Sequence, residues 1–135
     1  MRRGFTTALP RYSGFLANAP SIVLGDFNSN ASLDYGRAVN HSAVDRKLAT
    51  LGFRSAYHGF FGEEQGEETR PTHYFQRKKN RPFHIDYCYL PSQWLVNVTN
   101  VTVGEFSDWA TLSDHVPLVV TLDSPPPLSP APLLP

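Results

Sequence analysis

Three short polar motifs lie in or beside apolar, strand-like runs, and they constrain the fold of this chain more than any other feature. The motifs read GDFN at 25–28, HIDY at 84–87 and SDH at 113–115. The first follows the run 21–24, the second lies inside the run 83–90, and the third precedes the run 116–120. A bare carboxylate buried in such a run would cost several kcal/mol. The three motifs therefore predict strands whose ends or interiors bring polar side chains to partners.

Length, charge and cysteine content bound the class of protein. The 135 residues (15.1 kDa) suit one domain. A formal net charge of zero argues against a strong, global nucleic-acid footprint but leaves a local one open. The single cysteine, Cys88, cannot form an internal disulfide. No stretch approaches the roughly 20 apolar residues of a membrane span, and the basic start lacks the apolar segment of a secretory signal. These features predict a cytoplasmic location.

The pattern of apolar residues predicts mixed α and β structure. Helical spacing favours helices over 8–16 and 42–51, and apolar runs favour strands over 21–24, 72–75, 83–90, 95–103 and 116–122. Residues 53–61 are aromatic and suit a strand or an irregular bend, and the acidic stretch 62–68 suits an exposed loop. Because strands do not alternate regularly with helices, we expect a layered α+β or sandwich fold.

A change in composition marks a boundary near residue 124. From there the chain is mostly proline, which cannot maintain a backbone ladder. We expect a domain over 1–123 and a proline-rich disordered tail over 124–135. The tail is either inert, the favoured interpretation, or a ligand for a proline-binding module.

Asp26 and Asn28 directly follow a strand and a glycine that permits a sharp turn. An ionised aspartate can orient an attacking water or accept its proton, and an asparagine amide can donate to a phosphoryl oxygen. The alternative is a simple turn, in which Asp and Asn are common.

Asp86 interrupts an apolar strand, so it needs a partner or an edge position facing water. An imidazole is its natural partner, because a carboxylate on one ring nitrogen fixes the tautomer of the other. His115 could provide that imidazole. Its neighbour Asp114 would point the opposite way in an extended segment, toward a metal ion or a water. A Ser-Asp turn is the alternative for the last motif.

Together these motifs resemble the C-terminal half of the endonuclease/exonuclease/phosphatase (DNase I-like) superfamily. The resemblance runs from about residue 8 to residue 123 and rests on IVLGDFN at 22–28, FHIDY at 83–87 and LSDHVPL at 112–118. It implies half of a four-layer α/β-sandwich, with mainly antiparallel sheet and flanking helices. It also implies a hydrolase that uses Mg²⁺, with Mn²⁺ as a substitute, in nuclease or phosphodiesterase chemistry.

The resemblance implies a role for each matching residue. Asp26 corresponds to the aspartate that activates water and lies near the metal, and Asn28 to the asparagine on the scissile phosphate. Asp86 corresponds to the carboxylate paired with the terminal histidine, which is His115. Asp114 corresponds to a metal-site aspartate. Thr72 resembles a position beside the phosphate.

One departure concerns the metal. In the superfamily the N-terminal half supplies the glutamate that is the main metal ligand, and also one of two facing sheets. No Asp or Glu occurs over residues 1–20, and the glutamates at 63–68 fall in the expected surface loop. We therefore expect an exposed apolar sheet face, and a need for the missing N-terminal half or a self-association partner.

The sequence indicates the roles of the other charged and histidine side chains less specifically. The basic turn 77–81 could steer phosphate, although an ordinary solvated hairpin is the favoured interpretation. His73 follows Thr72 and could reach the site. No two histidines have the spacing of metal ligands, so no zinc site is expected.

Two hypotheses of different classes follow. In the first, the chain belongs to a Mg²⁺-dependent phosphoesterase that cleaves phosphodiester or phosphomonoester bonds by in-line water attack, with nucleic acid among its candidate substrates. In the second, the chain is a truncated, catalytically inactive half-domain fragment that lacks the metal-binding glutamate.

Overall fold

The computed structural model describes residues 2–36 and 40–124. The tail expected over 124–135 lies almost wholly outside the described residues. The described helices are α1 (Arg2–Asn18), α2 (His41–Thr50), α3 (Ala56–Phe61) and α4 (Phe106–Trp109), with 3₁₀ turns at Ala31–Leu33, Phe75–Arg77 and Ser92–Asn97. The strands are β1 (Val23–Asp26), β2 (Phe53–Ser55), β3 (His73–Tyr74), β4 (Pro82–Phe83), β5 (Asp86–Pro91), β6 (Val98–Val103) and β7 (Leu118–Leu122).

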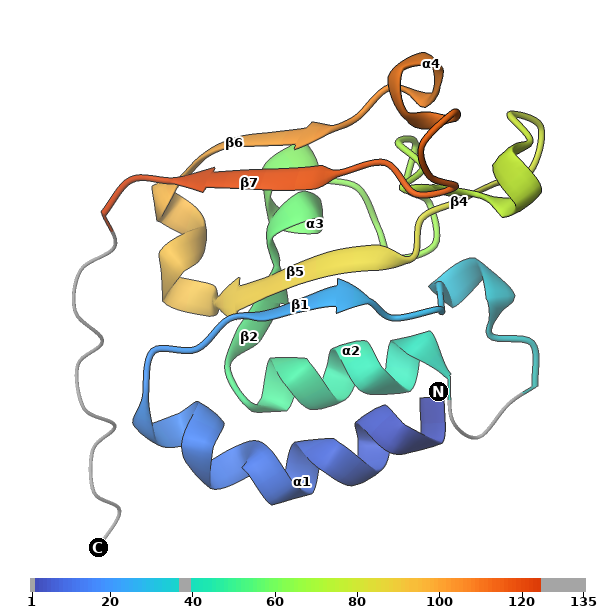
Figure 1. Ribbon diagram of the computed structural model, residues 1–135. Helices are drawn as coiled ribbons and strands as arrows, with labels where there is room; N and C mark the ends of the chain where they lie inside the picture. Colours follow the sequence, from blue (N-terminus) through green and yellow to red (C-terminus); the bar gives the residue numbers. More distant parts are fainter. Residues whose placement is uncertain (1, 37–39, 125–135) are drawn as a thin grey trace, which may run out of the picture.

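The strands form three small antiparallel sheets, in the orders β1-β5-β2, β3-β4 and β6-β7. Figure 1 shows them in layers: α1 lies against α2, α2 covers one face of the β1-β5-β2 sheet, and the β6-β7 ribbon lies over the opposite face. The expected mixed α+β class with antiparallel sheet is therefore confirmed. The ribbon also shows that part of a second, facing layer belongs to this chain.

Strand β5 alternates between two apolar clusters, one on each face of the central sheet. Tyr87 and Tyr89 point toward α1 and α2, and Cys88 and Leu90 point toward the β6-β7 ribbon. The first cluster comprises Leu9, Phe27, Val44, Leu48, Phe53, Tyr87 and Tyr89, and the second comprises Ala56, Cys88, Leu90 and Trp94. Five of the six residues of β5 are buried, because both faces of the strand are covered.

Local hydrogen bonds explain where α2 begins. The side chain of Asn40 caps the helix by accepting from the backbone N–H of Ala43. The carboxylate of Asp34 accepts from the N–H groups of His41 and Ser42, which places a negative charge at the positive end of the helix dipole. The predicted helix over 42–51 is thus present, with its start one residue earlier.

Three of the predicted elements differ in extent or type. Helix α1 begins well before residue 8 and continues through Pro10, which lies beside the buried Leu9. Residues 53–61 form β2 and then α3, not one strand or bend. The predicted strand 83–90 is broken at residues 84–85, between β4 and β5. His84 packs against Tyr57.

The acidic stretch 62–68 is more ordered than an exposed loop. The Glu68 side chain is only 2% exposed, and its carboxylate accepts from His58 Nε2 at 3.0 Å and from Asn30 Nδ2 at 2.9 Å. Glu63 accepts from the Tyr57 hydroxyl and from Arg70. Two of the four glutamates therefore tie the loop to the core, which composition alone does not reveal. Within the described residues, no helix has the length and apolar character that a membrane crossing requires.

Candidate active site

The first motif forms a rigid polar pair at the end of β1. Gly25 has a φ of +134°, in the region that favours glycine, and Asn28 has a φ of +48°, which is uncommon for a side chain other than glycine. The turn lets one oxygen of Asp26 accept from the Asn28 backbone N–H at 2.7 Å and the other accept from Asn28 Nδ2 at 2.6 Å. Backbone strain of this kind is concentrated at functional sites. Both side chains are exposed, so the pair faces solvent or a ligand.

Asp86 and His115 form the second polar pair. His115 Nδ1 donates to Asp86 Oδ2 over 2.9 Å, as the carboxylate–imidazole pairing from the sequence predicted. Asp86 is the first residue of β5 and stands directly opposite Asp26 in the β1–β5 register. The pair is partly exposed, with 33% of the His115 side chain accessible. Asp26 and Asp86, one from each polar pair, therefore lie on adjacent strand ends, and the Asp86–His115 bond joins residues that are 29 apart in sequence.

Thr72 lies beneath this centre and not on its surface. The residue is fully buried, and its hydroxyl oxygen accepts from the backbone N–H groups of Ile85 and Asp86, each at 3.1 Å. Those two hydrogen bonds give the backbone N–H groups of Ile85 and Asp86 an acceptor at the break between β4 and β5. In this structure Thr72 fixes the backbone that carries Asp86, whereas the resemblance places it beside the phosphate.

Replacement of Thr72 by valine is expected to destabilise the chain by about 1–3 kcal/mol, because it leaves two buried N–H groups without an acceptor. Urea unfolding followed by circular dichroism measures the change. Thr102→Val on the exposed side of β6 is the matched control, with an expected change within about 0.5 kcal/mol. Equal effects of the two substitutions would contradict the positioning role.

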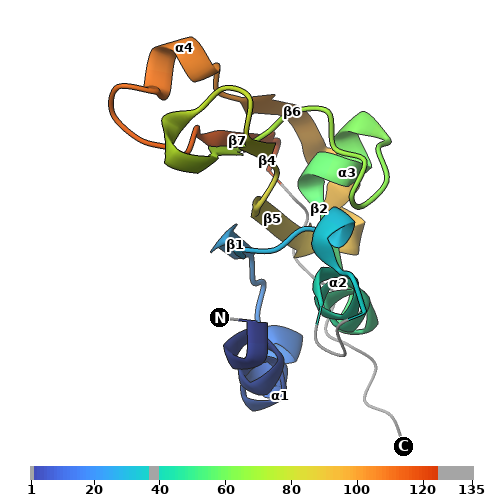
Figure 2. The same cartoon turned by 90° about the vertical axis from the view of Figure 1, so that its right-hand side faces the viewer.

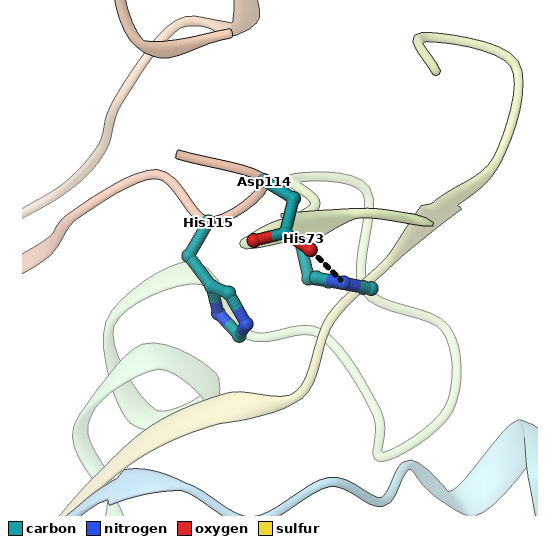
Figure 3. Close-up of side chains that lie close together, drawn as sticks. All are labelled: His73, Asp114 and His115. Atoms are coloured by element: carbon teal, nitrogen blue, oxygen red, sulfur yellow. Dashed lines mark ion pairs between the residues drawn. The ribbon is translucent and has the colours of Figure 1, made fainter. Parts of the chain in front are cut away.

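Asp114 and His73 complete the polar cluster around His115. The backbone pairs Thr72–Tyr74 with the last motif, through an isolated bridge between His73 and His115. His73 Nε2 lies 3.5 Å from Asp114 Oδ2, and the rings of His73 and His115 are 4.6 Å apart between centroids. Figure 3 shows these side chains close together at the third motif. The Asp114 backbone N–H, followed by the two imidazoles, lowers the pKa of the Asp114 carboxyl.

The residues present do not by themselves suit Mg²⁺. This ion prefers near-octahedral oxygen ligands and is usually held by one or two carboxylates with waters and substrate phosphate. In the described part of the chain, the group of three possible ligands that lies close enough is His73, Asp114 and His115, with a single carboxylate. Asp26 accepts from Asn28 with both of its oxygens. A Mg²⁺ site here would need further oxygen ligands.

An open apolar groove leads away from the centre, between the β1-β5-β2 sheet and β7. Its volume is about 340 Å³, and its lining includes Ile22, Leu24, Gly25, Asp86, Cys88, Leu90, Leu118 and Val120. Leu24 is 68% exposed, although it lies in the middle of β1. Figure 2 shows β1 at the side of the molecule away from α3, which closes the other side of the two layers. The apolar sheet face expected from the sequence is therefore present, but the β6-β7 ribbon covers part of it.

The basic turn 77–81 lies at the same end of the molecule as the SDH motif, and two of its cationic side chains already contact other parts of the protein. Arg77 donates to the backbone carbonyls of Thr111 and Leu112, just before Asp114. Arg81 lies over the ring of Phe75. Lys78 and Lys79 are exposed.

The arrangement of these elements matches half of a DNase I-like fold, as the resemblance of the sequence predicted. The structure matches 16 solved chains. One of them is a variant of the 3′ phosphatase NExo from Neisseria, bound to a product DNA hairpin, with a TM-score of 0.67 and 17% sequence identity.

The match covers 88% of this chain and 51% of the NExo chain, so the chain spans about half the length of that structure. At this identity the likeness concerns the fold. A scan against family models and a search of curated proteins found no match.

Proposed function

We propose that Asp26, Asn28, Asp86 and His115 form part of a centre that hydrolyses phosphate esters by in-line attack of water on phosphorus. The observation that carries the proposal is the meeting of two polar pairs at neighbouring strand ends: Asp26 with Asn28, and Asp86 with His115. This meeting occurs in a fold that matches half of a 3′ phosphatase.

Each residue has a role that its contacts support. Asp26 orients the attacking water and accepts its proton, which suits an exposed carboxylate held by two N–H donors. Asn28 Nδ2, which donates to Asp26 in this structure, donates to a phosphoryl oxygen when substrate binds. Asp86 holds His115 in the tautomer protonated at Nδ1. His115 Nε2 then faces the phosphate and stabilises its oxygens or exchanges a proton with the leaving group.

The substrate class in this proposal is a phosphomonoester or phosphodiester, and a nucleic-acid end is the first choice to test because NExo was captured with DNA. Dependence on Mg²⁺ or Mn²⁺ belongs to the proposal, since the superfamily implies it. The oxygen ligands that Mg²⁺ would need in addition to Asp114 are not among the clustered residues described above.

A hydrolysis assay tests the proposed activity. The purified chain, and the longer product if its coding sequence continues upstream in frame, is incubated with Mg²⁺ or Mn²⁺. The substrates are a 3′-phosphorylated DNA hairpin, abasic duplex DNA and bis-nitrophenyl phosphate. We expect EDTA-sensitive hydrolysis of at least one of them. Absence of hydrolysis by every form of the protein, with all three substrates, would contradict the proposal.

A second candidate function is favoured by the open groove and the half-length match: a half-domain that is inactive alone and binds a partner through this face. Exposed apolar patches on a strand mark interaction surfaces. The other half of such a domain, or a second copy of the chain, would cover Leu24 and its neighbours.

Sedimentation of the isolated chain tests this interface. We expect concentration-dependent self-association, and we expect Leu24→Asp to weaken it at least tenfold by placing a charge in an apolar contact. Val96→Asp, at a residue 88% exposed outside the groove, is the matched control. A chain that stays monomeric at all concentrations, or equal association of both variants, would rule out self-association through the groove.

A further inference from the structure

Two segments far apart in sequence, 72–74 and 114–116, bring together side-chain atoms that could bind a metal ion. The backbone N–H of Tyr74 donates to the carbonyl of Asp114 at 2.7 Å, and the N–H of Val116 donates to the carbonyl of Thr72 at 2.8 Å. These bonds fix His73 against His115 across a loop of about 40 residues. The ligand atoms of His73, Asp114 and His115 all lie within 4.8 Å of one another.

The spacing of these atoms is close to that of a metal site. Bonds of about 2.0–2.2 Å to nitrogen and oxygen place tetrahedral ligand atoms roughly 3.4 Å apart. His73 Nε2 and Asp114 Oδ2, at 3.5 Å, already have this separation. The widest pair, which is within 4.8 Å, must close by at most about 1.4 Å. The Asp114 side chain, which is 47% exposed, and the His115 side chain, which is 33% exposed, have room to do so.

The contacts behind the ligand atoms favour the same conclusion. Asp86 accepts from His115 Nδ1, which leaves Nε2 as the ring nitrogen available to a ligand. Histidines that bind metals commonly donate their other ring N–H to a carboxylate, which fixes the ring and raises its basicity. His73 meets Asp114 through Nε2, and its Nδ1 is buried without a hydrogen-bond partner in the described structure.

We propose that His73 Nε2, Asp114 and His115 Nε2 bind a divalent first-row transition-metal ion, such as Zn²⁺, in preference to Mg²⁺. Two imidazoles with one carboxylate suit transition metals, whereas Mg²⁺ favours oxygen ligands. Three protein ligands leave at least one position for water or a phosphate oxygen. This proposal does not depend on the hydrolytic activity.

Metal binding and the proposed proton exchange at His115 exclude each other, because both use Nε2. An ion in this site therefore removes His115 from acid–base chemistry. If the hydrolytic activity exists, micromolar Zn²⁺ would inhibit it through His73, a residue that the resemblance does not assign to the centre.

Binding of Co²⁺ to the full 135-residue chain, freed of metal with EDTA, tests the proposal without any activity assay. Co²⁺ is a spectroscopic substitute for Zn²⁺, because its visible absorption reports the ligand set. We expect one equivalent to bind with visible d–d bands, Zn²⁺ to displace it, and a thousandfold excess of Mg²⁺ to leave the bands unchanged.

Substitutions of the ligands assign the bound ion. His73→Ala and Asp114→Ala are each expected to weaken Co²⁺ binding at least tenfold, and Asp123→Ala, at an exposed aspartate after β7, is the matched control. Circular dichroism checks that each variant folds, and the exposed Asp114 position keeps the test valid if His73→Ala does not. Absence of Co²⁺ binding, displacement by Mg²⁺ as readily as by Zn²⁺, or unchanged binding by a folded ligand variant would overturn the proposal.

Discussion

Replacement of His115 by alanine is expected to lower the turnover of a phosphate ester by at least two orders of magnitude, in any form of the protein that hydrolyses one. A positioned acid–base group contributes about 10²- to 10⁴-fold to catalysis. The imidazole is partly exposed and bonded to Asp86, so its removal is expected to affect chemistry more than folding. Single-turnover kinetics measures the chemical step, and thermal unfolding checks the fold.

The Asp86–His115 pair provides an internal control for this prediction. If Asp86 acts through His115, Asp86→Asn lowers turnover in the wild type but has little further effect in His115→Ala, because residues that act as a unit are not additive. Asp123→Ala is the matched surface control, with unchanged turnover expected. Full activity in a folded His115→Ala variant would remove His115 from the mechanism. Additive losses would mean that Asp86 acts independently.

Replacement of Glu68 by alanine is expected to destabilise the chain by about 3–5 kcal/mol, because it leaves the His58 ring N–H and the Gly66 N–H without their acceptor and removes one of three acceptors around Asn30 Nδ2. The Glu68 carboxylate lies 3.0 Å from His58 Nε2 and 2.9 Å from Asn30 Nδ2, in a part of the core with little solvent access. Urea unfolding measures the change. Glu67→Ala, at the exposed neighbour, is the matched control, with a change within about 0.5 kcal/mol. Equal stability of the two variants would contradict the buried network.

The Glu68 carboxylate also makes the stability of the chain fall at low pH. Burial alone would raise the pKa of Glu68, but hydrogen bonds from His58, Asn30 and the Gly66 N–H outweigh it and lower the pKa to about 2. Since the folded pKa lies below the unfolded value of 4.5, the stabilisation is fully present above about pH 5 and is lost as pH falls toward 2. This loss is about 3 kcal/mol. In Glu68→Gln that part of the acid dependence should disappear.

The parts of the site that follow local sequence could be predicted. The strand-end positions of Asp26 and Asn28 come from a short apolar run, a glycine and a turn, all within a few residues. The pairing of Asp86 with His115 could be predicted because a carboxylate inside an apolar strand needs a partner. The class of fold followed from the same motifs, and the match to half of a DNase I-like structure confirms it.

Features that depend on distant partners could not be predicted. The sequence placed His73 beside Thr72 and within reach of the site, but its contact with Asp114 arises because two segments about 40 residues apart pair through their backbones. Histidine spacing in sequence therefore indicated no zinc site. At the break at residues 84–85, the Thr72 hydroxyl oxygen accepts hydrogen bonds from the backbone N–H groups of Ile85 and Asp86. The pattern of apolar residues in the sequence does not predict that contact.

The acidic loop shows the limit of composition. Four glutamates in seven residues indicate a solvated run, yet Glu68 is buried by a hydrogen-bond network with Asn30 and His58. The partners lie 38 and 10 residues away, so only the tertiary structure distinguishes Glu68 from the exposed Glu67.

The phosphate-binding role of the centre is tested most directly by NMR of the ¹⁵N-labelled chain during titration with a 3′-phosphorylated DNA hairpin. This measurement does not require turnover. We predict saturable shifts of the Asn28 side-chain amide and the His115 ring nitrogens, and loss of the Asn28 shifts in His115→Ala. Shifts confined to the basic turn 77–81, with Asn28 and His115 unchanged at saturation, would contradict a phosphate-binding centre at these residues.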